Sequence, residues 1–293
     1  MLAQQLFNAV VLGSVYALFS MGFTLTFGVL RVINLLYGFY VAAGAFISLV
    51  AVRDFDMPLW AAGIVGALGT GVFAVLCDSA ILSPLRRAKA SELSSLIVTL
   101  GGVLLLDNLM LLIFGAEVRR FPVTLLSQSP ISLGALQIGE VQLIIVVIVA
   151  VLVTALFLFI ERTRLGIAIR ALAENPDAAS LMGVNVDAMF TGVSFLAAAL
   201  SAIAGILIGL NFNAVHPYMG EPLMLRGFAV IIIGGLGDVR GALLAGLALG
   251  FIEVMTAGYL SSNFKDAAGF AAMVATLWLC PTGLFGRSVT RRA

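Results

Sequence analysis

The chain alternates long apolar segments with short polar ones. Eight of the apolar segments are long enough to cross a bilayer, because roughly 20 helical residues span about 30 Å of hydrocarbon. They lie near 5–27, 32–52, 58–82, 92–114, 141–161, 188–210, 241–260 and 266–286. A ninth segment, 218–237, has a short apolar run with Glu221, Pro222 and Arg226 near its start, as in a broken helix. This pattern predicts an all-α polytopic membrane protein with about nine transmembrane helices (eight to ten).

The distribution of Lys and Arg predicts the orientation, because basic residues favour the cytoplasmic side. If 218–237 crosses the membrane, eleven basic residues face the cytoplasm and five face outward; if it does not, the numbers are seven and nine. We therefore expect nine crossings, with the N-terminus outside and the C-terminus inside. No linker or low-complexity tract divides the chain, so 1–293 is expected to be a single domain.

Composition excludes several classes of protein. Hydrophobic residues make up 61% of the chain and charged residues 11%, with a mean hydropathy of +1.14, whereas soluble domains are nearer half apolar and a quarter charged. A net charge of +1 gives no field that would recruit nucleic acid. One histidine, two distant cysteines and no GxxxxGK[ST] string leave no metal cluster, ATP site or catalytic constellation. We expect no enzyme activity and no cofactor in this chain.

The polar segment Glu161–Met189 is the longest stretch expected to face the cytoplasm, and it has helix signals rather than linker composition. Asn175 is a plausible N-cap, Pro176 fits the first helical position, and Gly183 supplies a stop. A short helix is expected over Ala178–Met182. The apolar residues then left at the surface are Leu181, Met182 and Val184. Such a surface indicates either a docking site for a partner or an amphipathic helix that rests on lipid.

This loop resembles the coupling segment of permeases from the branched-chain amino acid ABC importers. The matching residues are Arg162, Thr163, Arg164, Leu165, Gly166, Arg170, Ala171, Asn175, Pro176, Ala178, Ala179, Leu181, Met182, Gly183 and Val184. The resemblance continues in GSVYALFSMGFTLTFGVLRVINLLYG from Gly13, VIIIGGLGDVRGALLAG from Val230 and CPTGLFG from Cys280, and it is to the LivH type of subunit. The chain departs from the usual family pattern at 35–37, where it reads Leu-Leu-Tyr.

The resemblance implies a permease domain similar to that of the cobalamin importer, with a cytoplasmic coupling loop over 162–187. The coupling helix would fit a cleft on a separate ATPase, which binds ATP and Mg. The coupling residues implied are Glu174, Asn175, Pro176, Asp177, Ala178, Ala179, Leu181, Met182, Gly183, Val184 and Asn185. Implied partners are a second, LivM-like permease, two ATPase subunits, a periplasmic binding protein and the lipid of a bacterial inner membrane.

Polar residues at membrane depth are costly, so they line a pathway or hold helices together through hydrogen bonds. The candidates for a pathway are Asn34, Tyr37, Asn211, Asn213 and His216. For Asp78 we expect a structural role. The acids within the spans have no evident basic partner, and Asp238 is expected to pair with Arg240 in a structural turn.

We interpret the chain as half of the translocation pathway of an ATP-driven importer for branched-chain or other small amino acids. One alternative keeps the importer class but changes the cargo to urea, amides or another small polar solute. A second alternative is a stand-alone channel or secondary transporter, which would not explain the apolar loop.

Overall fold

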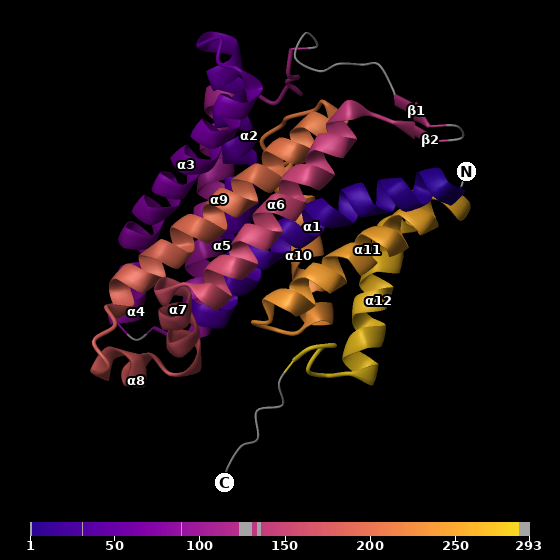
Figure 1. Cartoon of the computed structure of the whole chain (residues 1–293). Coiled ribbons are helices and arrows are strands. Elements are labelled where there is room, and N and C mark those ends of the chain that lie inside the picture. Colours follow the sequence, from indigo (N-terminus) through magenta and orange to yellow (C-terminus); the bar gives the residue numbers. More distant parts are fainter. Residues whose placement is uncertain (1, 31, 89, 123–130, 134–135, 287–293) are drawn as a thin grey trace.

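The computed structural model describes residues 2–30, 32–88, 90–122, 131–133 and 136–286. The helices, labelled as in Figure 1, are α1 (Leu2–Leu30), α2 (Leu36–Asp54), α3 (Leu59–Cys77), α4 (Ser83–Arg87), α5 (Glu92–Phe114), α6 (Glu140–Arg162), α7 (Arg164–Glu174), α8 (Pro176–Leu181), α9 (Val186–Phe212), α10 (Gly220–Gly234), α11 (Val239–Tyr259) and α12 (Lys265–Leu279). A π-helical turn, Asp78–Leu82, joins α3 to α4, and a 3-10 turn, Ser262–Phe264, precedes α12. Strands β1 (Ile131–Leu133) and β2 (Leu136–Ile138) form a small antiparallel hairpin.

Seven helices of the described chain are long and apolar enough to cross a membrane: α1, α2, α3 continued through α4, α5, α6, α9 and α11. The protein is therefore a multi-pass helical membrane protein, as predicted. Helices α10 and α12 have 15 residues each, which corresponds to about 22 Å at 1.5 Å per residue. The segments expected at 218–237 and 266–286 are thus shorter helices, and the second ends at Leu279 because a turn follows it.

Helix α1 forms the centre of the bundle and packs against α9, α10 and α11. Large aromatic side chains on α1 and α2, among them Tyr16, Phe19, Phe23 and Tyr40, are almost fully buried. By contrast, α5 and α6 expose apolar side chains such as Leu112 and Val151 along much of their length. A helix that is apolar all round suits a bundle interior, whereas an exposed apolar face suits contact with lipid.

The molecule has two ends that matter for function. At one end, called the hairpin end below, the start of α1 lies beside the β1–β2 hairpin (Figure 1). There the side chain of Gln4 donates to the carbonyl of Gln137 at 3.0 Å and accepts from its N–H at 3.0 Å. At the opposite end, the loop end, α7 and α8 lie together where α6 ends and α9 begins (Figure 1).

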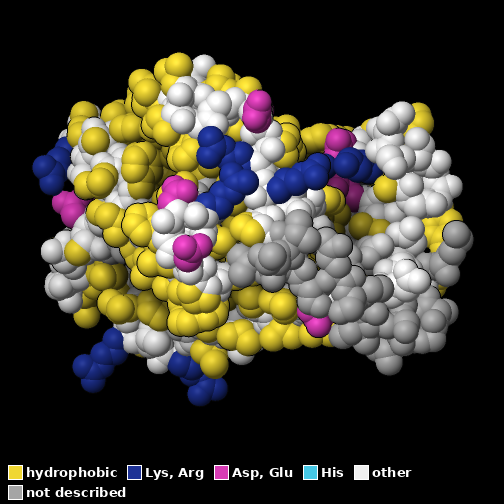
Figure 2. All heavy atoms as spheres, turned by 90° about the horizontal axis from the view of Figure 1, so that it is seen from above, with side chains coloured by type: hydrophobic (Ala, Val, Ile, Leu, Met, Phe, Trp, Pro, Cys, Tyr) yellow, Lys and Arg dark blue, Asp and Glu magenta, His cyan; other side chains and the backbone are white. Residues whose placement is uncertain are grey.

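The last described residues also reach the loop end. The N–H groups of Leu284 and Phe285 donate to the carbonyls of Ile233 and Gly234, at 2.8 and 3.1 Å, where α10 finishes. The described chain therefore starts at the hairpin end and finishes beside the loop end. Seen from above Figure 1, the molecule shows hydrophobic side chains over much of its surface, with charged side chains gathered at a few places (Figure 2).

Candidate functional site

The segment expected to form a coupling loop folds into two short helices. Helix α7 begins after Thr163, whose Oγ1 accepts a hydrogen bond from the backbone N–H of Gly166 at 3.0 Å. Ile169 and Leu172 are buried, so one face of α7 packs onto the transmembrane bundle. Helix α8 follows at once and lies at the surface of the loop end (Figure 1).

Asn175 fixes the start of α8. Its Oδ1 accepts hydrogen bonds from the N–H groups of Asp177 and Ala178, at 3.0 and 3.1 Å, and Pro176 occupies the first helical position. These contacts satisfy two of the donors that a helix start leaves unpaired. The expected cap is confirmed, although the helix covers Pro176–Leu181 rather than Ala178–Met182, because the first turn forms directly behind the cap.

Helix α8 ends in a Schellman motif. The N–H of Gly183 donates to the carbonyl of Ser180 at 3.0 Å, and the N–H of Val184 donates to that of Ala179 at 3.1 Å. Gly183 has a φ of +85°, a conformation that other residues rarely adopt. The glycine stop expected from the sequence is confirmed.

The end of α8 leaves two apolar side chains in solvent. Leu181 is 87% exposed and Met182 86%; we call this pair the apolar tip. Val184 was expected to be exposed with them, but it is half-buried and packs against the core. Ala179 is only 4% exposed, since α8 turns this residue toward the bundle.

The predicted coupling residues thus form one continuous segment from the end of α7 to the start of α9. Glu174 is the last residue of α7, and Asn185 caps α9 by accepting from the N–H of Ala188 at 3.1 Å. Caps at Thr163, Asn175 and Asn185 hold the segment in one conformation. The segment can therefore present its apolar tip as a rigid surface.

A second candidate site is a cavity of about 650 Å³ near the hairpin end, lined mainly by α1, α9, α10 and α11, with both apolar and polar side chains in its wall. Two of the residues expected on a pathway, Asn211 and His216, line it. Its other polar and charged residues are Gln5, Asn8, Tyr16, Gln142, Arg226, Glu253 and Lys265. Burial lowers the pKa of His216 below its usual value, against a smaller opposite effect from the charge of Glu221.

An ion pair between the buried Glu253 and the half-buried Arg226 forms part of the cavity wall. The Nε of Arg226 donates to Oε1 of Glu253 at 2.8 Å, and the Tyr16 hydroxyl donates to Oε2 of the same carboxylate at 2.7 Å. The Nη2 of Arg226 also donates to Asp266 at 2.6 Å. The expectation that acids within the spans lack a basic partner is wrong here.

The sequence indicates that Arg226 and Glu253 each need a polar or charged partner. Arg226 lies within the ninth segment, 218–237, and Glu253 lies within the segment 241–260. Ionisable groups at membrane depth usually face a partner or a water-filled cavity. Nothing in their spacing of 27 residues shows that α10 and α11 pack together, so the pairing itself needs the structure.

Asn213, also expected on a pathway, does not line this cavity. It ends α9 in the left-handed conformation, with a φ of +45°. Its Oδ1 accepts from the N–H of Phe121 at 3.0 Å, beside backbone hydrogen bonds between Arg119 and Val215. The contacts visible for Asn213 join the end of α9 to the segment after α5.

Asn34 and Tyr37 lie in the bundle toward the loop end and do not line the large cavity either. The Oδ1 of Asn34 accepts from the N–H of Leu36 at 3.0 Å, at the start of α2. The Tyr37 hydroxyl lies 2.7 Å from the Oγ1 of Thr26 and is fully buried. Both side chains therefore have partners within the fold.

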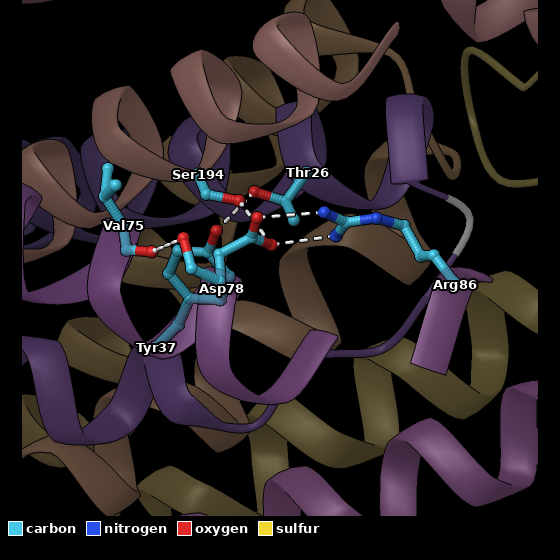
Figure 3. Close-up of polar contacts among 7 residues, drawn as sticks. Thr26, Tyr37, Val75, Asp78, Arg86 and Ser194 are labelled. Atoms are coloured by element: carbon cyan, nitrogen blue, oxygen red, sulfur yellow. Dashed lines mark hydrogen bonds and ion pairs between the residues drawn. The ribbon is translucent and has the colours of Figure 1, made fainter. Parts of the chain in front are cut away.

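Tyr37 belongs to a polar cluster around Asp78 (Figure 3). Arg86 donates from Nη1 and Nη2 to the two carboxylate oxygens of Asp78, at 2.8 and 2.9 Å, and the Ser194 hydroxyl lies 3.5 Å from Oδ1. The π-helical turn between α3 and α4 brings the arginine back to the aspartate eight residues earlier. Asp78, for which we expect a structural role, is thus held by contacts within the bundle, and Arg86 is a basic partner that the sequence analysis missed.

The side chains of the glycine-rich turn between α10 and α11 pair differently from the prediction. Asp238 caps α11 by accepting from the N–H groups of Arg240 and Gly241, at 2.8 and 2.9 Å. The guanidinium of Arg240 pairs with Glu161 at the end of α6 instead of with Asp238. A carboxylate at the helix start favours this arrangement because it complements the dipole of α11.

Comparison with known protein families and structures places these features in context. Residues 5–277 match the family described as the permease component of branched-chain amino acid transport systems. The high-affinity branched-chain amino acid transport permease LivH of Escherichia coli K12 is 32% identical over 97% of this chain and 95% of its own length. BraD of Pseudomonas aeruginosa, with the corresponding description, is 31% identical over the same shares.

A solved structure, PsaBC from Streptococcus pneumoniae in complex with Fab, has a chain of similar fold. The TM-score is 0.52 at 11% identity, over 97% of this chain and 93% of the other, so the likeness concerns the fold alone. The family match covers both the loop segment and the cavity residues up to α12. The chain is a transport subunit rather than an enzyme, and it belongs to the family of permease components of branched-chain amino acid ABC importers.

Proposed function

We propose that this chain forms half of the translocation pathway of an ATP-driven importer for branched-chain or other small amino acids in a bacterial inner membrane. Its partners in this proposal are a second, LivM-like permease, two cytoplasmic ATPase subunits that bind ATP and Mg, and a periplasmic binding protein. The observation that carries the proposal is the apolar tip, Leu181 and Met182, on a helix fixed at both ends. Exposed apolar groups on a rigid, capped helix suit a cleft on a protein partner.

In this proposal the segment 174–185 both binds the ATPase and transmits a conformational change from it. Closure of the ATPases on ATP would push α8, and the packing of α7 on the bundle would carry this movement into the transmembrane helices. ATP binding must then favour one state of the bundle by several kcal/mol, about 5.5 kcal/mol for a nearly complete switch. The residues 174–185, with Ala179 and Val184 packed inward, are the proposed coupling segment.

We assign the loop end to the cytoplasm, the N-terminus to the outside and the C-terminus to the inside. Charge supports this orientation. The described basic residues near the loop end are Arg86, Arg87, Arg162, Arg164, Arg170 and Arg240, whereas those near the hairpin end are Arg53, Arg119, Arg120 and Lys265. We also propose nine crossings in an arrangement like that of the cobalamin importer, in which the short helices α10 and α12 are the two remaining crossings.

The cavity near the hairpin end would be the outer part of the pathway, with Asn211 and His216 in its wall. Branched-chain amino acids are the cargo in the names of the relatives, and the cavity combines charged groups with apolar ones. The rival cargoes are urea, amides or another small polar solute. A stand-alone channel or secondary transporter has less support, because it gives the apolar tip no function.

Affinity purification from the native membrane in mild detergent, followed by mass spectrometry, tests the assembly. The proposal expects an ATPase, a second permease and a periplasmic binding protein to co-purify with this chain. Recovery of the chain alone, with solute flux in liposomes that needs no ATP, would favour the channel or secondary transporter. The co-purified binding protein can then be screened against leucine, urea and short amides to decide the cargo.

A further inference from the structure

We propose that the Arg226–Glu253 ion pair is a substrate subsite that binds the charged groups of a zwitterionic α-amino acid. This inference rests on the proposed importer function and adds the residues and the ligand chemistry. Arg226 would receive the carboxylate of the amino acid, and Glu253 would receive its ammonium group.

The position of the pair supports this role. The large cavity of about 650 Å³ contacts a second one of about 260 Å³, and Pro222, Arg226 and Glu253 line both. The second cavity lies between α10, α11 and α12. The ion pair is therefore a wall shared by both cavities, and the larger cavity falls within the range of about 300–1,000 Å³ that is usual for ligand pockets.

The chemistry of the pair matches both ends of a zwitterion. A guanidinium binds carboxylates through parallel N–H donors, and Arg226 already uses Nε and Nη2 for the carboxylates of Glu253 and Asp266. The carboxylate of an entering amino acid can replace that of Glu253 on Arg226 while the ammonium group of the ligand compensates the charge released on Glu253. The exchange leaves no unpaired buried charge, which would otherwise cost several kcal/mol.

Tyr16 completes the polar side of the subsite. Its hydroxyl donates to Oε2 of Glu253 at 2.7 Å, and its ring lies under the Arg226 guanidinium, 5.5 Å from the ring centroid. These contacts hold both charged side chains in place during the exchange. Polar side chains nearby, Asn8, Gln142 and Asn211, offer further hydrogen bonds.

The rest of the wall suits an aliphatic side chain. The apolar residues that line the large cavity include Val11, Leu12, Ile208, Leu223 and Val254. A ligand with both charges at one end and a branched hydrocarbon at the other fits this division. Urea, which has neither charge nor hydrocarbon, would use neither half of the cavity.

A cysteine reporter tests the subsite directly. Ala257 lines the large cavity one helical turn after Glu253 on α11, so Ala257→Cys in a Cys77→Ser, Cys280→Ser background places a reactive thiol there. The assembled permease–ATPase complex is treated with a water-soluble maleimide. The probes are leucine, 3-methylbutylamine, which lacks the carboxylate, and isovalerate, which lacks the ammonium.

We expect leucine to slow labelling severalfold and both analogues to leave it unchanged. Equal protection by all three probes would mean that only the hydrocarbon binds, and no protection by leucine would leave the ion pair as a structural lock. A thiol that does not react at all would show that the cavity is closed to water. Each of these three results would overturn the inference.

The double variant Arg226→Gln/Glu253→Gln removes both charges and keeps groups that can hydrogen-bond. Protection by leucine should disappear in this variant while the ATPase still co-purifies. Arg53→Gln is the control for the loss of a positive charge near the hairpin end, because Arg53 is exposed at the end of α2 and lines neither of these two cavities, and it should leave protection intact. If the double variant fails to assemble, protection of the Ala257→Cys reporter by the three probes still tests whether both charged groups of leucine are bound.

The proposed function and this subsite can fail separately. Wild-type importer that takes up urea but no leucine would overturn the proposed cargo and the subsite with it. Wild-type importer that takes up leucine, combined with no protection of the reporter, would overturn the subsite alone.

Discussion

Gly13 on α1 and Gly250 on α11 bring two transmembrane helices into backbone contact. A Cβ added to Gly250 would lie 2.4 Å from the Cα of Gly13, and one added to Gly246 would lie 2.6 Å from the Cα of Ala17. Helices α1 and α11 form the most extensive helix pair of the described chain. In lipid, small residues drive such close packing because burial of apolar side chains gains little.

The first prediction concerns this contact. Gly250→Ala should lower the thermal stability of the purified subunit in detergent, since the added methyl group pushes α11 away from α1, at a cost of about 1–3 kcal/mol. Gly63→Ala on α3 is the matched control, because a Cβ there meets nothing within 4 Å. If both variants melted at the wild-type temperature, the contact between Gly13 and Gly250 would not contribute to the stability of the subunit.

The second prediction concerns the apolar tip. Met182→Glu should abolish ATP-coupled uptake and reduce co-purification of the ATPase, because a charge replaces an apolar group that enters the partner's cleft. The subunit itself should remain folded, since Met182 is 86% exposed. Met182→Leu, which keeps an apolar side chain, should transport normally. Full coupling in Met182→Glu would show that α8 does not dock through this residue.

Two other substitutions in the loop, Ala179→Arg and Gly183→Trp, would not test docking alone. Ala179 and Gly183 both belong to the segment that resembles a coupling loop, and a bulky residue at either would be expected to block docking alone. The structure contradicts that expectation, because Ala179 is buried and Gly183 has a positive φ. Ala179→Arg and Gly183→Trp would disturb the fold of the loop as well as its surface.

The third prediction concerns the cap of α8. Asn175→Ala removes the acceptor for the N–H groups of Asp177 and Ala178 and should destabilise the short helix by about 1 kcal/mol. Hydrogen exchange should become faster at these two amides, and coupled uptake should fall in part. Asn175→Asp keeps the acceptor and should preserve both. Unchanged exchange in Asn175→Ala would show that the cap does not hold the helix.

The fourth prediction concerns pH. Because burial lowers the pKa of His216 in the folded protein, the unfolded chain binds more protons than the folded one near and below the usual histidine pKa of about 6.5. The contribution of His216 to stability is therefore complete above that pH and declines as the pH falls through the lowered value. Thermal unfolding of the subunit should show this loss on acidification, and His216→Gln should reduce it. An identical pH profile in both proteins would contradict the assignment.

The sequence predicted best what local patterns determine. Length and hydropathy indicated the long helices, and the Asn175 cap and Gly183 stop were visible because each acts on residues within a few positions. The short helix between Asn175 and Gly183 was predictable from the same local signals. The ends of α8 differed by one or two residues, as is usual for helix boundaries.

The sequence predicted poorly what depends on which helices meet. Arg226 forms an ion pair with Glu253 on α11, and Arg240 forms one with Glu161 on α6. Asn213 accepts a hydrogen bond from Phe121. In each pair the two residues lie far apart in the sequence. A hydropathy profile shows where helices lie in the chain but not how they pack. The large cavity is lined by residues of six helices, α1, α6, α9, α10, α11 and α12, so the sequence analysis identified only two of its residues, Asn211 and His216.

The most direct test of the central claim is reconstitution of this chain in liposomes with its second permease, the ATPases and the binding protein. Uptake of radiolabelled leucine is then measured with ATP, without ATP and with the Met182→Glu variant. The account predicts leucine accumulation that requires ATP, the binding protein and an intact apolar tip. Leucine flux that proceeds without ATP, or that is unaffected by Met182→Glu, would contradict it.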